Sequence, residues 1–261
     1  MTEDGLFDKR ASAFGEVASA YAEHRPDYPI DGIRWALARA RRAPLRILDL
    51  GAGTGKLTGG LLSLGLEVIA VEPDTGMLGE LTRRFSAVPA LAGTAERIPL
   101  AGATVDAVLA GQAFHWFRLD PALTEIARVL RPGGVFAALW NYDDQTVEWV
   151  GQLDKLAHTS ASHLHSPGTG LFGRGDEFPV HQAFSSFERR YFRHTRRHTA
   201  ESLTSTLGTH SHTIVIPPQE RADVLARVRA FLESHPETGN GEFELPMRTT
   251  VLRARRSNSV A

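Results

Sequence analysis

The chain has 261 residues, 42% of them hydrophobic and 23% charged, with a formal net charge of −1 and no cysteine. This composition excludes collagen-like, disordered and coiled-coil proteins, and the near-zero charge provides no global field for nucleic acid or an anionic membrane. The missing cysteines exclude disulfides, zinc fingers, thiol nucleophiles and iron–sulfur clusters. The N-terminus is charged, and every apolar run is far shorter than the ~20 residues of a membrane span, so we expect a soluble, cytoplasmic protein.

Helical periodicity marks the beginning of the chain. Apolar residues at steps of three and four, Phe14 and Tyr21 among them, predict a first helix. The two prolines of RPDYP (25–29) end it. A second helix is predicted over roughly residues 30–42.

Beyond residue 45, short apolar runs alternate with helical segments. Strands are predicted at 45–50, 66–73, within 87–100, 105–111 and 134–141. Helices are predicted at 57–65, 75–86 and 120–130. The last of these is expected to begin at Asp120-Pro121 and to stop at RPGG (131–134). Strands that alternate with helices in this way predict a parallel sheet with helices on both faces.

The alternation is lost after residue 145. Residues 158–179 are rich in His, Ser, Gly and Pro and predict a loop, whereas 187–199 have strand-like stretches. An amphipathic helix is predicted over 217–236, and 243–256 predict a last strand, antiparallel at the sheet edge. This less periodic part is the natural place for a substrate cap, which we expect in 145–183 and 199–216.

We therefore predict an α/β fold with a seven-stranded, doubly wound, mostly parallel sheet. The chain is expected to form a single domain, 1–261. Its parts are N-terminal lid helices (1–44), a cofactor-binding core (45–141), and a cap insertion with the last strands (142–261).

A glycine turn, DLGAGTGK (49–56), follows the first predicted strand of the core. It fails as a P-loop, because Leu50 stands at the first glycine and Leu57 follows the lysine. It also lacks the third glycine of the dinucleotide fingerprint, where Lys56 stands. We interpret Lys56 as a solvent-facing residue at the start of a helix.

Two carboxylates favour a ligand that is nucleoside-like and cationic. Asp49 directly precedes the glycines, where it would repel a pyrophosphate and attract a cation. Glu72 ends the second strand, where a carboxylate accepts ribose hydroxyls. Each alone is equally compatible with a capping role. Together they predict S-adenosylmethionine (SAM), which carries an adenine, a ribose, an ammonium and a sulfonium, and no phosphate.

Several linked segments carry a family resemblance: LDLGAGTGKLT (48–58), VEPDTGML (71–78), GTAERIPL (93–100), VDAVLAGQAFHWF (105–117) and LRPGGVFAALWN (130–141). With them, roughly residues 10–141 resemble the class I SAM-dependent methyltransferases, in particular the type 11 or UbiE-like small-molecule branch. The segment 14–29 is similar to the lid helix of that branch. The resemblance fades after residue 145, where substrates are recognised, so it implies the chemistry rather than the substrate.

The resemblance implies a Rossmann-like methyltransferase fold with SAM as its cofactor. The residues that it implies at the cofactor are Tyr21, Arg25, Asp49, Gly51, Ala52, Gly53, Thr54, Gly55, Glu72, Pro73, Met77, Thr94, Ala95, Glu96 and Gln112. Arg25 would pair with the methionine carboxylate, and the Ala95 backbone N–H would face the adenine. Thr94 departs from the branch, which often has Asp there, so adenine recognition is expected to depend on Ala95 and on packing by Ile98.

Methyl transfer is an in-line displacement, so the protein mainly has to align a nucleophile and exclude water. His115, just past the fourth strand, is the candidate general base, with a packing role as the alternative. Phe14, Tyr21 and Trp116 are candidates to face the sulfonium, or are ordinary core residues.

The remaining polar clusters predict little on their own. His158, His163 and His165, like His210 and His212, lack the spacing and acidic neighbours of a metal site, so no metal is predicted. The basic run Arg189, Arg190, Arg193, Arg196 and Arg197 either attracts an anionic substrate or forms a solvated strand face.

The predicted function is methyl transfer from SAM to a small molecule, and the sequence leaves the acceptor and the oligomeric state open. Nucleic acid is disfavoured as the substrate, because a nucleic-acid stripe would need more basic residues elsewhere and a pI above about 9, whereas the pI of this chain is about 6.8. Two alternatives remain: a SAM-fold binding protein without turnover, and an NAD-dependent oxidoreductase, which Asp49 and the missing third glycine disfavour.

Overall fold

The computed structural model describes residues 27–40, 46–162, 180–209 and 211–257. The chain separates into two compact units. One comprises Met1–Pro26, Tyr142–His165 and Arg193–Arg248, and the other comprises Asp27–Asn141, Ser166–Phe192 and Thr249–Ala261. Within the described residues, no helix is both long and apolar enough to cross a membrane.

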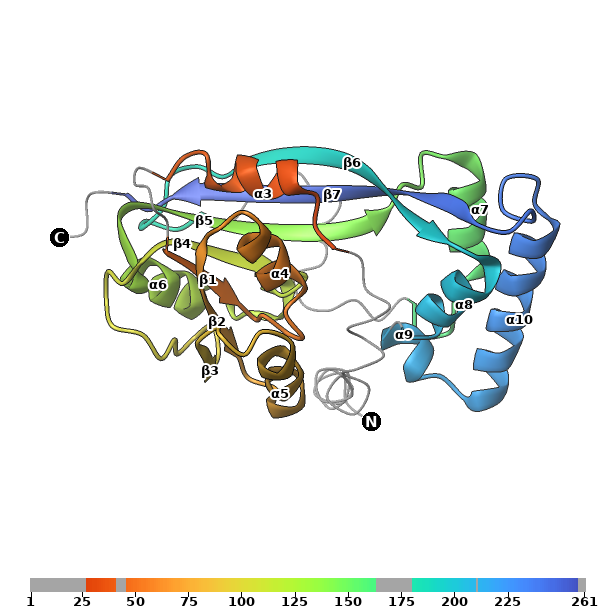
Figure 1. Ribbon diagram of the computed structural model, residues 1–261, viewed down its shortest axis with the longest axis horizontal. Helices are drawn as coiled ribbons and strands as arrows, with labels where there is room; N and C mark the ends of the chain where they lie inside the picture. The colour runs from red at the N-terminus through yellow and green to blue at the C-terminus, as the bar shows by residue number, and fades with distance from the viewer. Residues whose placement is uncertain (1–26, 41–45, 163–179, 210, 258–261) are drawn as a thin grey trace. The chain divides into compact units, whose positions relative to one another are not determined.

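The strands form one seven-stranded sheet in the order β3-β2-β1-β4-β5-β7-β6 (Figure 1). Their bounds are β1 Arg46–Leu50, β2 Glu67–Glu72, β3 Ala90–Ala92, β4 Val105–Gly111, β5 Leu130–Asp143, β6 Glu188–His198 and β7 Phe243–Arg255. The first five strands pair in parallel. The predicted seven-stranded α/β sheet is therefore confirmed.

Helices connect the strands as the sequence pattern predicts. Their bounds are α3 Ile30–Leu37, α4 Lys56–Ser63, α5 Thr75–Arg84, η1 Phe114–Trp116, α6 Leu119–Val129, α7 Glu148–Leu156, α8 Ala200–Gly208, α9 Ser211–Ile214 and α10 Pro218–Ser234. Asp74 caps α5 by accepting the Met77 N–H at 2.9 Å. The N-cap of α6 is Arg118, not Asp120 as expected, and Asp120 lies in the first helical turn instead.

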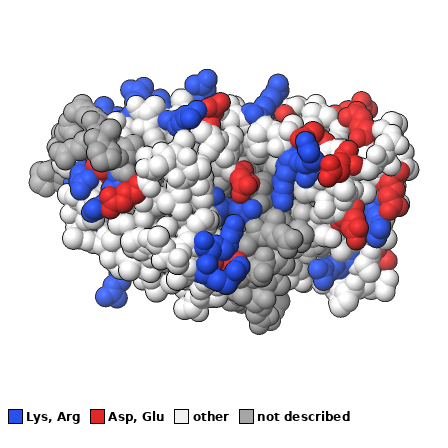
Figure 2. Space-filling model, in the orientation of Figure 1, with Lys and Arg blue, Asp and Glu red and all other residues white. Residues whose placement is uncertain are grey.

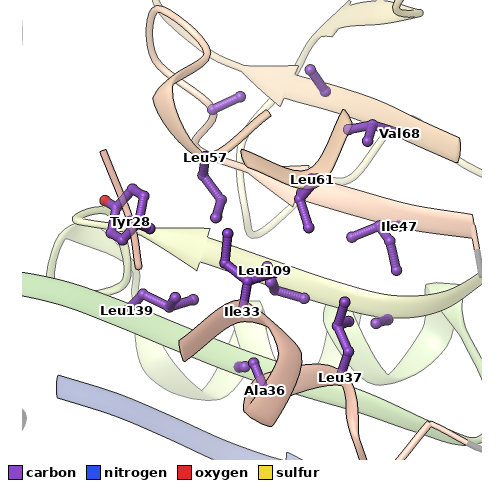
Figure 3. Packing of buried hydrophobic residues seen from close by; sticks show 14 of the residues in the cluster. Tyr28, Ile33, Ala36, Leu37, Ile47, Leu57, Leu61, Val68, Leu109 and Leu139 are labelled. Carbon is purple, nitrogen blue, oxygen red and sulfur yellow. The ribbon is translucent and has the colours of Figure 1, made fainter. Parts of the chain in front are cut away.

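One face of the sheet packs against α3, α4 and α5. Figure 3 shows the residues of α3 and α4 that take part. Ile33 and Leu37 of α3 and Leu57 and Leu61 of α4 meet Leu109 of β4 in one buried cluster. Alternate strand residues belong to this cluster because successive side chains of a strand point to opposite faces. The helices therefore hold the turns that follow β1 and β4 at one end of a rigid sheet.

Aromatic side chains pack on the opposite face. Phe136 of β5 lies next to Val135, which faces the helix cluster, and its ring centroid is 4.9 Å from that of Phe114. Phe184 and Phe187 complete the group at 6.1 and 6.2 Å from Phe136. The short helix η1 is thus anchored to the sheet by a fully buried ring, Phe114.

The last strand is not at the sheet edge, as the sequence pattern predicts, because β7 lies between β5 and β6. Its arrow points opposite to those of β5 and β6 in Figure 1, so the predicted antiparallel direction is correct. Burial explains the position: residues 249–254 are all buried, whereas β6 exposes every second residue from 191 to 197. The edge position belongs to β6.

The RPGG segment is also different from expectation. It lies within β5, which begins at Leu130, and the β4–β5 register shifts between Val105 and Ala107. Gly133 has φ +74°, and a Cβ on Gly134 would lie 2.8 Å from the Asp106 carbonyl oxygen. The glycines therefore form an irregularity inside the strand instead of a turn before it.

The unit that contains α7, α8 and α10 has a core of its own. Trp149, Leu203, Val228 and Phe243 are buried together, and the rings of Trp149 and Phe243 meet edge to face. This is the part of the chain for which the sequence predicts a cap. The predicted single-domain organisation stays a prediction.

Candidate active site

The turn between β1 and α4 requires glycine at two of its positions for packing. Gly51 has φ +68°, and a Cβ there would lie 2.6 Å from the Ala113 Cβ. Gly55 has φ +87°, and its Cβ would lie 2.7 Å from the Phe85 ring. Gly53, at φ +55°, differs because the nearest atom to its Cβ position is the Met77 sulfur at 3.7 Å. The turn is packed tightly on both sides and open at its middle glycine.

Asp49 lies fully buried at the end of β1. Its Oδ2 accepts the Thr58 hydroxyl at 2.6 Å. Burial raises the pKa of Asp49 to about 7, the Thr58 hydrogen bond opposes the rise, and the Glu72 carboxylate adds to it. Near neutral pH the carboxyl group therefore exists in both protonation states, and a bound cation would favour the ionised one.

Glu72 connects the glycine turn to the end of β2. Its Oε2 accepts the Gly53 N–H at 2.8 Å, and its Oε1 accepts the Asp74 N–H at 2.9 Å. Burial raises the pKa of this carboxyl as well, against the two backbone hydrogen bonds. Each carboxylate oxygen keeps a further lone pair, so Glu72 can also accept hydroxyl groups of a ligand.

Unpaired buried atoms test whether the turn fits SAM. Asp49 Oδ1 and Thr54 Oγ1 are buried and have no hydrogen-bond partner in the described part of the chain. Buried polar atoms are nearly always paired in native proteins, so two orphans in one turn mark a place for a polar ligand. A carboxylate and a hydroxyl suit the ammonium and carboxylate groups of SAM, and the space at Gly53 allows the backbone to approach it.

The predicted adenine segment lies partly buried. Ala95 and Ile98 are 5% and 3% exposed, whereas Thr94 and Pro73 are exposed. The Glu96 carboxylate accepts the Arg118 N–H at 2.9 Å, so it stabilises the start of α6.

The turn after β4 depends on contacts with β5. Gln112, with φ +53°, donates its backbone N–H to the Leu139 carbonyl at 2.8 Å and its Nε2 to the Asn141 carbonyl at 3.0 Å. His115 follows in η1 and accepts a hydrogen bond at Nδ1 from Trp140 Nε1 at 3.2 Å. Trp116 is half-buried, with its ring centroid 5.2 Å from that of His115.

The structure brings most of the predicted cofactor residues into one unit, and some lie outside the described residues. Phe14, Tyr21 and Arg25 are among the latter. Lys56 does begin α4, but the prediction that it faces solvent is wrong. Its side chain is 18% exposed, and its Nζ lies 3.2 Å from an Asp27 oxygen.

The basic run of β6 has partners of its own. Arg193 pairs with Asp144 at 3.4 Å, and Arg197 pairs with Glu244 at 3.3 Å. Of the histidines considered for a metal, His158 contacts the Asp154 carbonyl at 3.0 Å. No group of three or more possible metal ligands occurs among the residues that the structure describes.

Sequence reasoning missed three residues of the site. Thr58 holds Asp49, Arg84 donates to the Thr54 carbonyl at 3.1 Å, and Trp140 contacts His115. Thr58 is the third residue of α4, nine positions after Asp49, so a search for polar residues in the first turn of that helix could have found it. Trp140 gives no local signal, because it is 25 residues from His115 in the chain.

Comparisons with known proteins show the family of the chain. The methyltransferase domain model Methyltransf_11 matches residues 48–138. An uncharacterised methyltransferase of Mycobacterium tuberculosis (strain H37Rv) is 38% identical over 93% of this chain and 95% of its own length. A malonyl-[acyl-carrier protein] O-methyltransferase of Methylococcus capsulatus is 42% identical over 36% of each chain.

A solved methyltransferase structure is similar to this chain over nearly its whole length. The chain is similar to a structure described as a type II methyltransferase from Anaeromyxobacter dehalogenans, with a TM-score of 0.66 and 30% identity. The similarity covers 89% of this chain and 97% of that one. Since relatives above 30% identity extend along nearly the whole sequence, the chain belongs to the class I SAM-dependent methyltransferases.

Proposed function

We propose that this enzyme transfers the methyl group of SAM to an oxygen atom of a small-molecule acceptor, in the cytoplasm. The observation that carries the proposal is the buried Oδ1 of Asp49, which has no hydrogen-bond partner among the described residues and precedes the turn that is open at Gly53. A site of this kind favours a cationic ligand that the backbone can approach closely.

Three groups of the chain are proposed to hold the cofactor. Glu72 accepts the ribose hydroxyls while its existing bonds to Gly53 and Asp74 keep the carboxylate in place. Asp49 and Thr54 bind the polar end of the methionine part. When bound, SAM supplies a sulfonium methyl group that a nucleophile displaces in line. The protein contributes alignment and the exclusion of water, and alignment alone supplies up to roughly 7–11 kcal/mol.

The adenine and lid contacts follow from the family resemblance and stay proposals. Ala95 is proposed to face the adenine with its backbone N–H, with Ile98 packing beside it. Pro73, Met77, Thr94, Glu96 and Gln112 are proposed around the same cofactor. Tyr21 and Arg25 are proposed to cover it from the N-terminal segment.

Two observations support a small acceptor and an oxygen nucleophile. On the face that Figure 2 shows, Lys and Arg are interspersed with Asp and Glu, unlike the basic stripe that nucleic-acid recognition needs. The Methylococcus relative is named an O-methyltransferase of a malonyl group. That name supports oxygen as the acceptor atom to test first.

The proposal is tested by titration calorimetry with S-adenosylhomocysteine, with NAD⁺ as a parallel ligand, and then by transfer from labelled SAM to an acceptor panel. We expect binding of S-adenosylhomocysteine, no binding of NAD⁺, and label on at least one small molecule. Asp49→Asn is expected to weaken binding about tenfold or more, the usual loss when a charged hydrogen bond is removed.

Glu67→Gln is the matched control, because Glu67 begins β2 at the opposite end of the strand from Glu72 and pairs with Arg46 at 2.6 Å. Its affinity for S-adenosylhomocysteine should equal that of the wild type. Equal affinity of Asp49→Asn and wild type would contradict the proposed role of Asp49. Tight binding without transfer to any compound would favour a SAM-binding protein that does not turn over.

A further inference from the structure

The hydrogen bond between Trp140 and His115 determines where the imidazole carries its proton. The indole nitrogen is a donor only, so His115 Nδ1, 3.2 Å away, must be the acceptor and cannot bear a hydrogen. In a neutral imidazole the hydrogen then lies on Nε2. Trp140 is 2% exposed, which protects this bond from competing water.

The imidazole belongs to a segment that packs against the glycine turn. A Cβ on Gly51 would lie 2.6 Å from the Ala113 Cβ and 3.6 Å from the Phe117 ring. Phe114 anchors the same segment on Phe136, with ring centroids 4.9 Å apart. The segment that carries His115 therefore packs, through Ala113 and Phe117, against the turn that is proposed to bind the cofactor.

We propose that Trp140 holds His115 as a hydrogen-bond donor, and that the Nε2–H of His115 binds an anionic oxygen of the methyl acceptor. This inference rests on the proposed function and narrows its substrate class to carboxylates. It replaces proton abstraction by His115, because the nitrogen that would take the proton already accepts from Trp140.

The chemistry of a carboxylate acceptor matches a site with a donor in this position. The acceptor oxygen forms a bond to the methyl carbon while the carbon–sulfur bond breaks and its electron pair stays on sulfur. A carboxylate and a sulfonium thus become a neutral ester and a neutral thioether, and no proton moves. A hydroxyl acceptor would instead release a proton that a base has to take.

The assignment is tested first by nitrogen-15 spectra of histidine-labelled enzyme saturated with S-adenosylhomocysteine. His115→Gln identifies the His115 signals by their disappearance. In the wild type we expect protonated Nε2 and unprotonated Nδ1. Trp140→Phe should lower the ratio of this tautomer to the other roughly fivefold, the factor for one ordinary hydrogen bond.

Trp149→Phe is the matched control, because Trp149 is equally buried but packs in the other core. It should leave the His115 signals unchanged. A predominant Nδ1–H tautomer in the wild type would overturn the proposal, and this spectrum decides the matter even if Trp140→Phe does not fold.

Kinetics then separates a donor from a base. Gln keeps a donor near the Nε2 position but cannot take a proton, so His115→Gln should retain most of the transfer rate that His115→Ala loses. The panel pairs short straight-chain carboxylic acids with the alcohols of the same length, and label is expected only on the acids. Labelled alcohols, or equal losses in both variants, would overturn the inference. Absence of label on every compound would contradict the proposed function, while the nitrogen spectra would still decide the tautomer.

Discussion

The turns that follow β1 and β4 lie side by side, yet they are stabilised in opposite ways. The β1 turn is held by residues close in the chain: Thr58 is nine positions from Asp49, and Glu72 is 19 from Gly53. The β4 turn is held by β5: His115 is 25 positions from Trp140, and Gln112 is 29 from Asn141.

Under the roles proposed above, this difference separates a cofactor turn from an acceptor turn. Short-range contacts make the β1 turn readable from a short motif, which suits a ligand shared by a whole family. Long-range contacts make the β4 turn depend on which residues β5 presents to it. Acceptor specificity can therefore change through β5 without disturbing the cofactor turn.

The largest effect is expected where the two turns touch. Gly51→Ala forces a residue other than glycine to φ +68° and places its Cβ 2.6 Å from that of Ala113. The expected loss of stability is about 2–4 kcal/mol, from left-handed strain and overpacking. Adding Ala113→Gly should recover the overpacking part, measured by urea unfolding of both single variants and the double variant. Simple additivity of the two changes would show that the turns are not in contact.

The pH dependence of stability sharpens the comparison for the β1 turn. The pKa of Asp49 is raised from 3.8 to about 7, so the folded protein keeps a proton that the unfolded chain releases. The resulting stability is complete below pH 4 and is lost as pH rises through 7. Because of Asp49, the free energy of unfolding of the ligand-free protein, measured with urea, should fall by roughly 2–3 kcal/mol between pH 5 and 8.

Asp49→Asn should remove most of the decrease in the free energy of unfolding between pH 5 and 8. The raised pKa of Glu72 should leave a smaller decrease in the same direction. A wild-type stability that rises from pH 5 to 8 by the same amount would be inconsistent with a protonated Asp49.

Thr58→Val tests the short-range support of the β1 turn. The change leaves Asp49 Oδ2 without its 2.6 Å hydrogen bond. At pH 8, where the carboxylate is ionised, the expected loss is about 2 kcal/mol, and it should be smaller at pH 5. Thr82→Val is the control, because Thr82 is exposed and donates its hydroxyl to the Leu78 carbonyl of its own helix. An identical loss at both pH values would mean that the hydrogen bond does not depend on the charge of Asp49.

The smallest effect concerns Gln112 in the β4 turn. Gln112→Ala loses the 3.0 Å bond to Asn141 and keeps the strain of φ +53°, which should lower stability by about 1 kcal/mol. Gln112→Gly loses the same bond but relieves the strain, so it should be about 1 kcal/mol more stable than the alanine variant. Thermal unfolding of the alanine and glycine variants measures this difference. Equal midpoint temperatures would mean that the backbone at Gln112 is not strained.

Local signals account for the parts of the fold and site that the sequence predicted well. The strands around Asp49 and Glu72 and the helices after them are short apolar runs and periodic segments, each bounded by its own turn residues. The glycine spacing, with the two carboxylates Asp49 and Glu72 at the ends of their strands, was enough to indicate SAM. These features need no knowledge of distant residues.

The errors concern residues whose environment is set by distant parts of the chain. Lys56 lies close to a carboxylate of Asp27, which no helix pattern predicts. The interior position of β7 depends on the burial of 249–254 against both neighbouring strands. The bond from Trp140 to His115 likewise requires β5 to lie beside β4.

The edge position of β6 has a consequence for association. An edge strand presents unpaired backbone groups to which another chain can add a strand. Exposed arginines at 190, 193 and 197 line this strand, and Arg193 and Arg197 are oriented by ion pairs with Asp144 and Glu244. The guanidinium groups that first suggested an anionic substrate thus discourage uncontrolled strand addition, and their replacement by threonine would leave the sheet open to aggregation.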